Sequence, residues 1–279
     1  MGLAPPRRAF AGPLAAPDAV MSAAPPAPAL ALNPAPRPWD VFREQLGAVR
    51  LTLRREAAVA GGLALLFTAF TWMASVADGG TGPFTPGGDF LPGVMALLVP
   101  MAVWKEEGPR LRGYHHGMPV ARSTHAMVRA GAGLAWLLLG VGVYLAWLGA
   151  LSGGFDGDAA PWRWVAPFAG AAVIYLFSTA LTLRASHPWW WLGGGCVALV
   201  FLTEISRVGG GVAPLADAVW DVFLGRYGLE TVLMGRAFDT GYVVVPALPS
   251  LGAWVTAVCI WVPAALGTFL LAAHRQPES

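Results

Sequence analysis

The sequence predicts an all-α, polytopic membrane protein with about six transmembrane helices and an N-terminal amphipathic interfacial helix. Of its 279 residues, 56% are hydrophobic and 12% are charged, and the mean hydropathy is +0.57. A soluble domain carries about 25% charged residues. The composition therefore excludes an ordinary water-soluble enzyme and a nucleic-acid-binding chain, so the expected surroundings are a lipid membrane and no nucleic acid.

The chain divides at the end of its Pro-rich start. Residues 1–37 are dominated by Ala and Pro and predict a disordered tail, because so much proline leaves no helical or alternating pattern. Residues 38–275 form the expected transmembrane domain.

The expected interfacial helix covers Trp39–Arg55, where apolar residues recur at helical spacing. Its cationic positions are Arg43, Arg50, Arg54 and Arg55. Such a helix lies at a membrane surface with its arginines toward anionic headgroups. A solvated start to the first membrane helix explains the same pattern, and the sequence does not separate the two.

Six apolar runs follow. A helix needs about 20 apolar residues to cross a hydrocarbon core of ~30 Å. The runs place spans at residues 57–77, 91–104, 127–151, 164–183, 189–204 and 252–273. The second run is short and contains Pro92 and Pro100, which predicts a broken or marginal span. Between the fifth and sixth spans, residues 205–250 are expected to form an external, partly helical cap.

The distribution of arginines orients these spans. Cationic residues concentrate in cytoplasmic loops. With the N-terminus inside, most basic residues fall on the cytoplasmic side: the four arginines of residues 39–55, then Lys105, Arg110, Arg112, Arg122, Arg129, Arg184 and Arg275. The pattern predicts a multi-pass protein of the bacterial inner membrane with both termini in the cytoplasm.

Motifs for chemistry are missing. There is no Gly-x-x-x-x-Gly-Lys-[Ser/Thr] phosphate loop, no His-Glu-x-x-His zinc motif and no Gly-x-Ser-x-Gly nucleophile turn. The cysteines, Cys196 and Cys259, lie in apolar runs and are expected to behave as buried small hydrophobes. We expect no catalytic, cofactor-binding or metal-binding residue, and the nearly charge-free spans argue against an ion-coupled carrier.

One charged segment lies between the second and third spans. It begins with Lys105, Glu106, Glu107 and Gly108, and it ends with Met118-Pro119-Val120-Ala121-Arg122 before the third span. This layout resembles the permease subunits of type-two ATP-binding-cassette transporters, in which acidic residues and a glycine end the second span and a Pro-Val-Ser-Arg-like sequence precedes the third. Here alanine replaces the serine, and Gly108-Pro109 replaces the usual Gly-Thr.

The resemblance covers about residues 39–275 and implies a division of labour. A separate cytoplasmic ATPase subunit hydrolyses ATP, and a loop helix within residues 105–129 docks on it. The partner-coupling residues would be Glu106, Glu107, Met118, Pro119, Val120 and Arg122. The permease would work as a dimer of identical or different copies, with export as the expected direction.

Two other interpretations remain. A membrane scaffold or accessory subunit without a transport path also explains the lack of polar intramembrane residues. A membrane-embedded enzyme is disfavoured, because no paired carboxylates or clustered histidines suggest a site. A simpler explanation of Arg122 and Arg129, without a partner, is that both anchor the third span at the headgroups.

Overall fold

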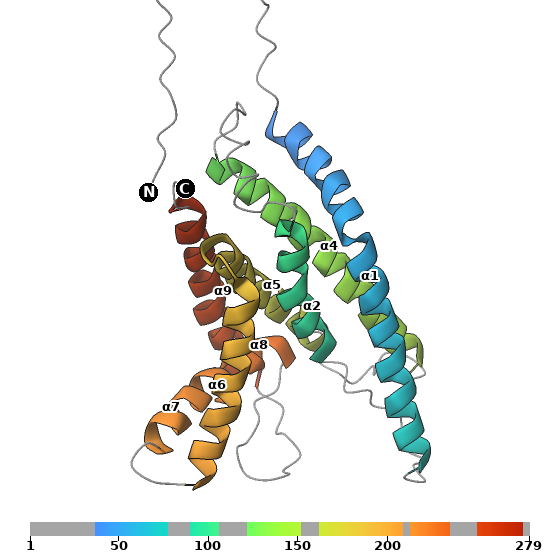
Figure 1. Cartoon of the computed structure of the whole chain (residues 1–279). Helices are drawn as coiled ribbons and strands as arrows, with labels where there is room; N and C mark the ends of the chain where they lie inside the picture. The colour runs from blue at the N-terminus through green and yellow to red at the C-terminus, as the bar shows by residue number, and fades with distance from the viewer. Residues whose placement is uncertain are drawn as a thin grey trace, which may run out of the picture. The chain divides into compact units, whose positions relative to one another are not determined.

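A computed structural model describes residues 37–77, 90–105, 122–151, 162–208, 213–234 and 250–275. Every regular element in these ranges is an α-helix, which confirms the all-α class. The helices, in chain order, are α1 Pro38–Ala77, α2 Phe90–Trp104, α4 Arg122–Leu151, α5 Trp162–Arg184, α6 Pro188–Val208, α7 Ala213–Leu224, α8 Leu229–Met234 and α9 Leu251–His274 (Figure 1). The tail of residues 1–36 lies outside the described ranges.

Three of these helices are long and apolar enough to cross a membrane: Ser123–Ala150 in α4, Trp164–Arg184 in α5 and Leu251–His274 in α9. Two shorter apolar helices accompany them, at Leu91–Trp104 and Pro188–Leu202. These helices give the chain the character of a membrane protein, and the count of six spans stays a prediction.

The N-terminal helix differs from the expected arrangement. The segments expected as an interfacial helix and a first span form one continuous helix of 40 residues. The junction between them explains this, because Arg54, Arg55, Glu56 and Ala57 are all strong helix formers and no proline or glycine interrupts them. A separate interfacial helix is therefore not seen.

Prolines lie inside three of the described helices without ending them. α2 continues through Pro100, α5 contains Pro167 near its start, and α9 contains Pro263. The Ser178 hydroxyl on α5 donates to the Leu97 carbonyl in the turn before Pro100, at 2.9 Å. This bond ties α5 to α2 beside the proline; the carbonyl that loses its helical donor to Pro100 is the preceding one, that of Ala96. The second apolar run is thus a short, unbroken helix.

The helices alternate in direction. α1, α4 and α6 run away from one end of the bundle, whereas α2, α5 and α9 run toward it (Figure 1). At that end α1, α2, α4, α5 and α9 share a core whose buried residues include Val49, Trp104, Ala130, Leu183 and Phe269. Further along, Ala96, Leu137 and Tyr175 form a second core between α2, α4 and α5.

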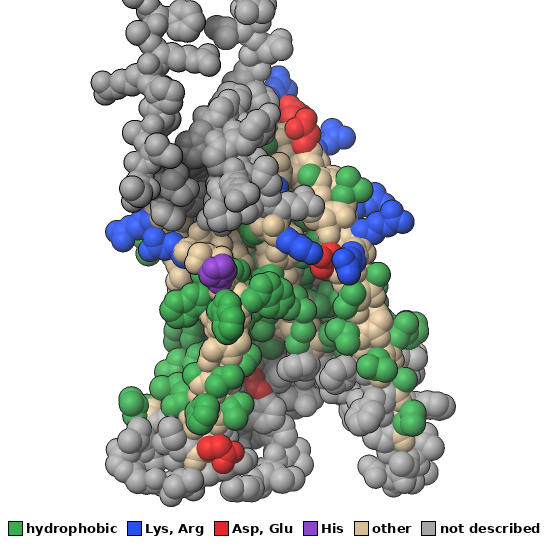
Figure 2. All heavy atoms as spheres, in the orientation of Figure 1, with side chains coloured by type: hydrophobic (Ala, Val, Ile, Leu, Met, Phe, Trp, Pro, Cys, Tyr) green, Lys and Arg blue, Asp and Glu red, His purple; other side chains and the backbone are tan. Residues whose placement is uncertain are grey.

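Cationic side chains gather at the end where α1 begins and α9 finishes. Figure 2 shows Lys and Arg there and an apolar band beneath them. We call this the basic end. Its described cations are Arg37, Arg43, Arg50, Arg54, Arg55, Lys105, Arg129, Arg184 and Arg275. The start of α1 and the end of α9 both lie at this basic end of the bundle.

Candidate functional site

The structure describes only some of the residues singled out from the sequence, and those lie at the basic end. The four arginines of the expected interfacial helix, Arg43, Arg50, Arg54 and Arg55, are all exposed on the first half of α1. Arg122 is the first residue of α4. The remaining coupling residues lie outside the described ranges: Glu106, Glu107, Met118, Pro119 and Val120. What the structure does describe is the pair of helix ends that flank them.

Arg129 joins those two helix ends. Its Nη2 donates to the Val103 carbonyl at 2.7 Å and its Nε to the same oxygen at 3.2 Å. Its guanidinium also lies 5.6 Å from the centroid of the Trp104 ring. The last carbonyls of a helix lack intrahelical donors, and a cation there is favoured by the helix dipole. Arg129 therefore caps α2 and fixes it to α4, rather than only anchoring α4 at headgroups.

Two more hydrogen bonds bind the basic end together. The Trp136 indole of α4 donates to the Leu46 carbonyl of α1 at 3.0 Å. Nη1 of Arg184, at the end of α5, donates to the Arg275 carbonyl after α9 at 3.2 Å. These contacts join α4 to α1 and the end of α5 to the end of α9.

The far end of the bundle is built differently. Here α7 and α8 occupy part of the expected external cap, and α8 turns back between α5 and α9 (Figure 1). Val232 of α8 is fully buried against Val173 and Ala257. Two indoles of α9 hold the returning chain: Trp261 donates to the Tyr227 carbonyl at 2.9 Å, and Trp254 to the Val232 carbonyl at 3.4 Å.

Gly170 of α5 makes this return possible. A Cβ atom at residue 170 would overlap the Leu233 backbone, and it would lie 2.6 Å from the Leu233 Cβ atom. Only glycine permits such an approach of one backbone to another. The short helix α8 is therefore seated in the bundle at a position that α5 leaves open for it.

Metal-ligating side chains do not cluster in the described part of the chain. Among the described residues, no group of three or more His, Cys, Asp or Glu side chains is placed to hold a metal ion. The expectation of buried cysteines is wrong with respect to the bundle: Cys196 and Cys259 are exposed on the outer faces of α6 and α9 and are not paired with each other. An apolar run leaves its outward residues facing lipid, which explains their exposure.

Comparison with known proteins adds no assignment. No protein-family model, no curated protein and no solved structure matches this chain.

Two residues of the site are not predicted from the sequence. The sequence places Arg129 at the start of the third span as a headgroup anchor, although a cation two turns into a helix is also a signal for a contact with a neighbouring helix end. Glu56 gave a stronger signal of a functional role. It lies between Arg55 and the apolar run that follows, and a carboxylate at the edge of a span is costly unless it has a role.

Proposed function

We propose that this chain is the membrane permease subunit of an ATP-binding-cassette transporter, driven by a separate cytoplasmic ATPase. The proposal rests on the resemblance carried by Glu106, Glu107 and the Pro119-Val120-Ala121-Arg122 sequence. The single structural observation that supports it best is the Arg129 contact. This contact joins the two helices that flank the proposed docking segment.

The contact matters because of how such a motor must work. A permease without an ATP site is moved from outside, through an element that passes force to the membrane helices. Residues 105–129 begin at the end of α2 and run into α4. With Arg129 fixing the end of α2 to α4, a push on this segment moves α2 and α4 together.

The proposed orientation follows from charge. The basic end would face the cytoplasm, in agreement with the concentration of arginines in cytoplasmic loops. α1, α2 and α6 would complete six spans with α4, α5 and α9. The α7–α8 return would then lie on the outer side and close the bundle there.

A second copy of the permease is part of the proposal. α6 packs mainly on α7, and a Cβ atom at Gly193, Gly194 or Gly195 would meet nothing within 4 Å. Exposed small residues on a membrane helix permit close approach of another helix. α6 is therefore the surface where we expect the two permeases to meet.

The decisive experiment is ATPase stimulation. A neighbouring gene that encodes a Gly-x-x-x-x-Gly-Lys-[Ser/Thr] phosphate loop would supply the candidate ATPase; the chain is co-expressed with this candidate, and the complex is purified and assayed in lipid nanodiscs. Arg122→Glu is expected to abolish co-purification and stimulation, because it puts a carboxylate where a bidentate guanidinium contact with an acidic partner is expected. Membrane insertion should be unchanged.

Arg275→Glu is the matched control, since Arg275 is exposed at the same end of the bundle but lies outside the proposed docking segment. It should leave stimulation within about twofold of the wild type. Normal stimulation by the Arg122→Glu protein would contradict the docking contact. If no ATP-binding subunit co-purifies with the wild type, the result favours a membrane scaffold over a transporter subunit.

A further inference from the structure

A long groove runs between α1, α2 and α4. It has a volume of about 730 Å³, and apolar side chains form most of its walls, among them Leu63 of α1, Leu98 of α2 and Val143 of α4. The groove forms because the part of α1 after Leu53 packs less closely on the other helices. Among the described side chains of α1 after this residue, none is buried. Membrane lipid is therefore in direct reach of the groove.

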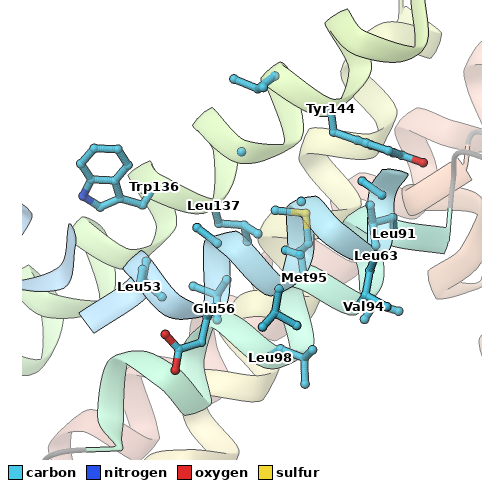
Figure 3. A pocket seen from close by; sticks show the side chains of 18 of the residues that line it. Leu53, Glu56, Leu63, Leu91, Val94, Met95, Leu98, Trp136, Leu137 and Tyr144 are labelled. Atoms are coloured by element: carbon cyan, nitrogen blue, oxygen red, sulfur yellow. The ribbon is translucent and has the colours of Figure 1, made fainter. Parts of the chain in front are cut away.

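The two ends of the groove differ in chemistry. Figure 3 shows Glu56 and Leu53 toward one end and Leu63, Leu91 and Tyr144 toward the other. The charged side chains that line the groove are Arg55, Glu56 and Lys105. Arg55 and Glu56 are successive residues of α1, and Lys105 directly follows α2 at the basic end. One end is therefore charged, and the rest is apolar.

Glu56 has a buried atom that lacks a hydrogen-bond donor. Its Oε2 atom is buried, and no donor among the described residues reaches it. Buried polar atoms are hydrogen-bonded in the great majority of cases, and an unsatisfied carboxylate oxygen is costly. Since this residue lines the groove, rotation of its carboxylate turns the Oε2 atom to the groove, where a bound molecule supplies the donor.

The neighbouring cations set a second requirement. Arg55 and Lys105 are both exposed and line the same groove as Glu56. Guanidinium and ammonium groups bind phosphate oxygens through charge-assisted hydrogen bonds. A molecule complementary to this end thus carries an anionic phosphate, a nearby hydrogen-bond-donating cation and a long apolar body.

We propose that the groove binds a membrane phospholipid with a primary-amine headgroup, whose ammonium donates to Glu56 and whose phosphate faces Arg55 and Lys105. Phosphatidylethanolamine has this chemistry. Its zwitterionic headgroup matches the mixed charges, whereas a purely anionic headgroup offers the Glu56 carboxylate no cation and repels it.

The length of the groove agrees with one acyl chain. From Glu56 to Leu65 the α1 wall extends about 13 Å at 1.5 Å per residue. Half of a hydrocarbon core of ~30 Å is about 15 Å, the depth of one leaflet. The headgroup at the basic end therefore places the acyl chain in the leaflet on that side.

This proposal does not depend on an ATPase. The lipid site is formed by residues of one chain and is tested without a partner, so its failure and the failure of the transporter proposal are separate results. A scaffold protein with the same groove would bind the same lipid.

The test is lipid competition on the purified full-length chain. The protein is exchanged into an equimolar mixture of phosphatidylethanolamine and phosphatidylcholine with identical acyl chains, and bound lipid is measured by native mass spectrometry. Phosphatidylcholine keeps the phosphate but has no N–H donor. The wild type should prefer phosphatidylethanolamine about tenfold, the size of one hydrogen bond to a charged group.

Three variants sharpen the result. Glu56→Gln should reduce the preference to less than about twofold. The double variant Arg55→Gln, Lys105→Gln should weaken binding of both lipids and leave their ratio unchanged. Ala64→Trp, which fills the apolar part, should reduce the binding of both lipids.

Glu44→Gln and Ala58→Trp serve as matched controls, because both residues are exposed on α1 and do not line the groove. Equal binding of the two lipids by the wild type would overturn the proposal, as would a full preference in the Glu56→Gln protein. In a second exchange, into an equimolar mixture of phosphatidylethanolamine and phosphatidylglycerol, stronger binding of phosphatidylglycerol would overturn the ammonium contact. If Glu56→Gln fails to fold, the wild-type ratio of the two lipids and the result for Ala64→Trp still test the proposed lipid site.

Discussion

α5 and α6 are successive apolar helices of similar length, yet their surroundings are opposite. α5 packs against α2, α4, α8 and α9, and its Ala171, Val173, Tyr175 and Thr179 are fully buried. α6 packs mainly on α7, and none of its described side chains is buried. The Trp190 side chain near its start is 80% exposed.

The difference shows that an apolar helix in a membrane protein is not necessarily buried in protein. Lipid tails are as apolar as leucine, so an apolar face is equally suited to lipid and to another helix. What distinguishes α5 is its polar groups. The Tyr175 hydroxyl donates to the Ala130 carbonyl at 2.8 Å, and the Thr179 hydroxyl donates to the Tyr175 carbonyl at 2.7 Å. Buried hydroxyls with backbone partners mark the helix that protein surrounds.

The largest expected effect comes from placing the same side chain on each helix. Gly170→Val should destabilise the protein by about 3 kcal/mol or more, because the new side chain meets the Leu233 backbone and the backbone cannot move aside cheaply. Gly194→Val on α6 should cost less than about 1 kcal/mol in the single detergent-solubilised chain, where no second copy covers α6. Thermal unfolding followed by size-exclusion chromatography in detergent measures both. Similar losses for the two variants would contradict the contrast.

Gly133 of α4 provides a second test. A Cβ atom there would overlap the Tyr175 hydroxyl and would lie 3.2 Å from the Val103 Cγ2 atom. Gly133→Ala should therefore cost about 1–3 kcal/mol, in the range of overpacked cores. Combining it with Tyr175→Phe should recover part of the loss, since the hydroxyl is removed. Strict additivity in this double-mutant cycle would show that the two residues are not in contact.

A smaller effect is expected at the α7–α8 return. Trp261→Phe removes the N–H donated to the Tyr227 carbonyl and should cost about 1 kcal/mol. Trp190→Phe on the exposed start of α6 is the matched control and should be nearly neutral. Hydrogen exchange localises the change: residues 225–234 should exchange faster in the Trp261→Phe protein, and unchanged exchange there would argue against the contact.

The smallest effect concerns the hydroxyl between α5 and α2. Ser178→Ala removes the donor to the Leu97 carbonyl and should cost about 0.6 kcal/mol, the average for such bonds between membrane helices. Thr256→Ala is a control within one helix, since this exposed hydroxyl donates to the Gly252 carbonyl of its own helix. A loss above about 2 kcal/mol for Ser178→Ala would mean that α2 depends on this bond more than expected.

Particular elements show how far prediction from the sequence reaches. The run at residues 252–273 predicted α9 within one residue at each end, because a long apolar run with polar flanks has one favourable conformation in a bilayer. The run at 127–151 predicted α4 but missed its first turn, since Arg122–Ala126 is helical and polar. The docking residues before Arg122 stay a prediction.

The candidate site was predicted less well than the helices. The arginines of residues 43–55 are exposed on one helix, but their role at a membrane surface stays a prediction. The Arg129–Val103 contact was not predicted, since it joins two helices whose facing sides depend on rotation about their axes. The charged end of the groove, formed by Glu56 and Lys105, was also not predicted, because these two residues are far apart in the chain.

By itself, the sequence determined the class of this protein and its charge polarity. Composition and apolar run length fix the cost of leaving a segment in water, and that cost does not depend on neighbours. Only the tertiary structure decided that α8 returns beside Gly170, that Arg129 caps α2, and that α1 leaves a groove below Leu53. Inside a bilayer, lipid-facing and protein-facing surfaces are equally apolar, so those choices depend on shape and hydrogen bonds between helices, which the hydrophobic pattern does not record.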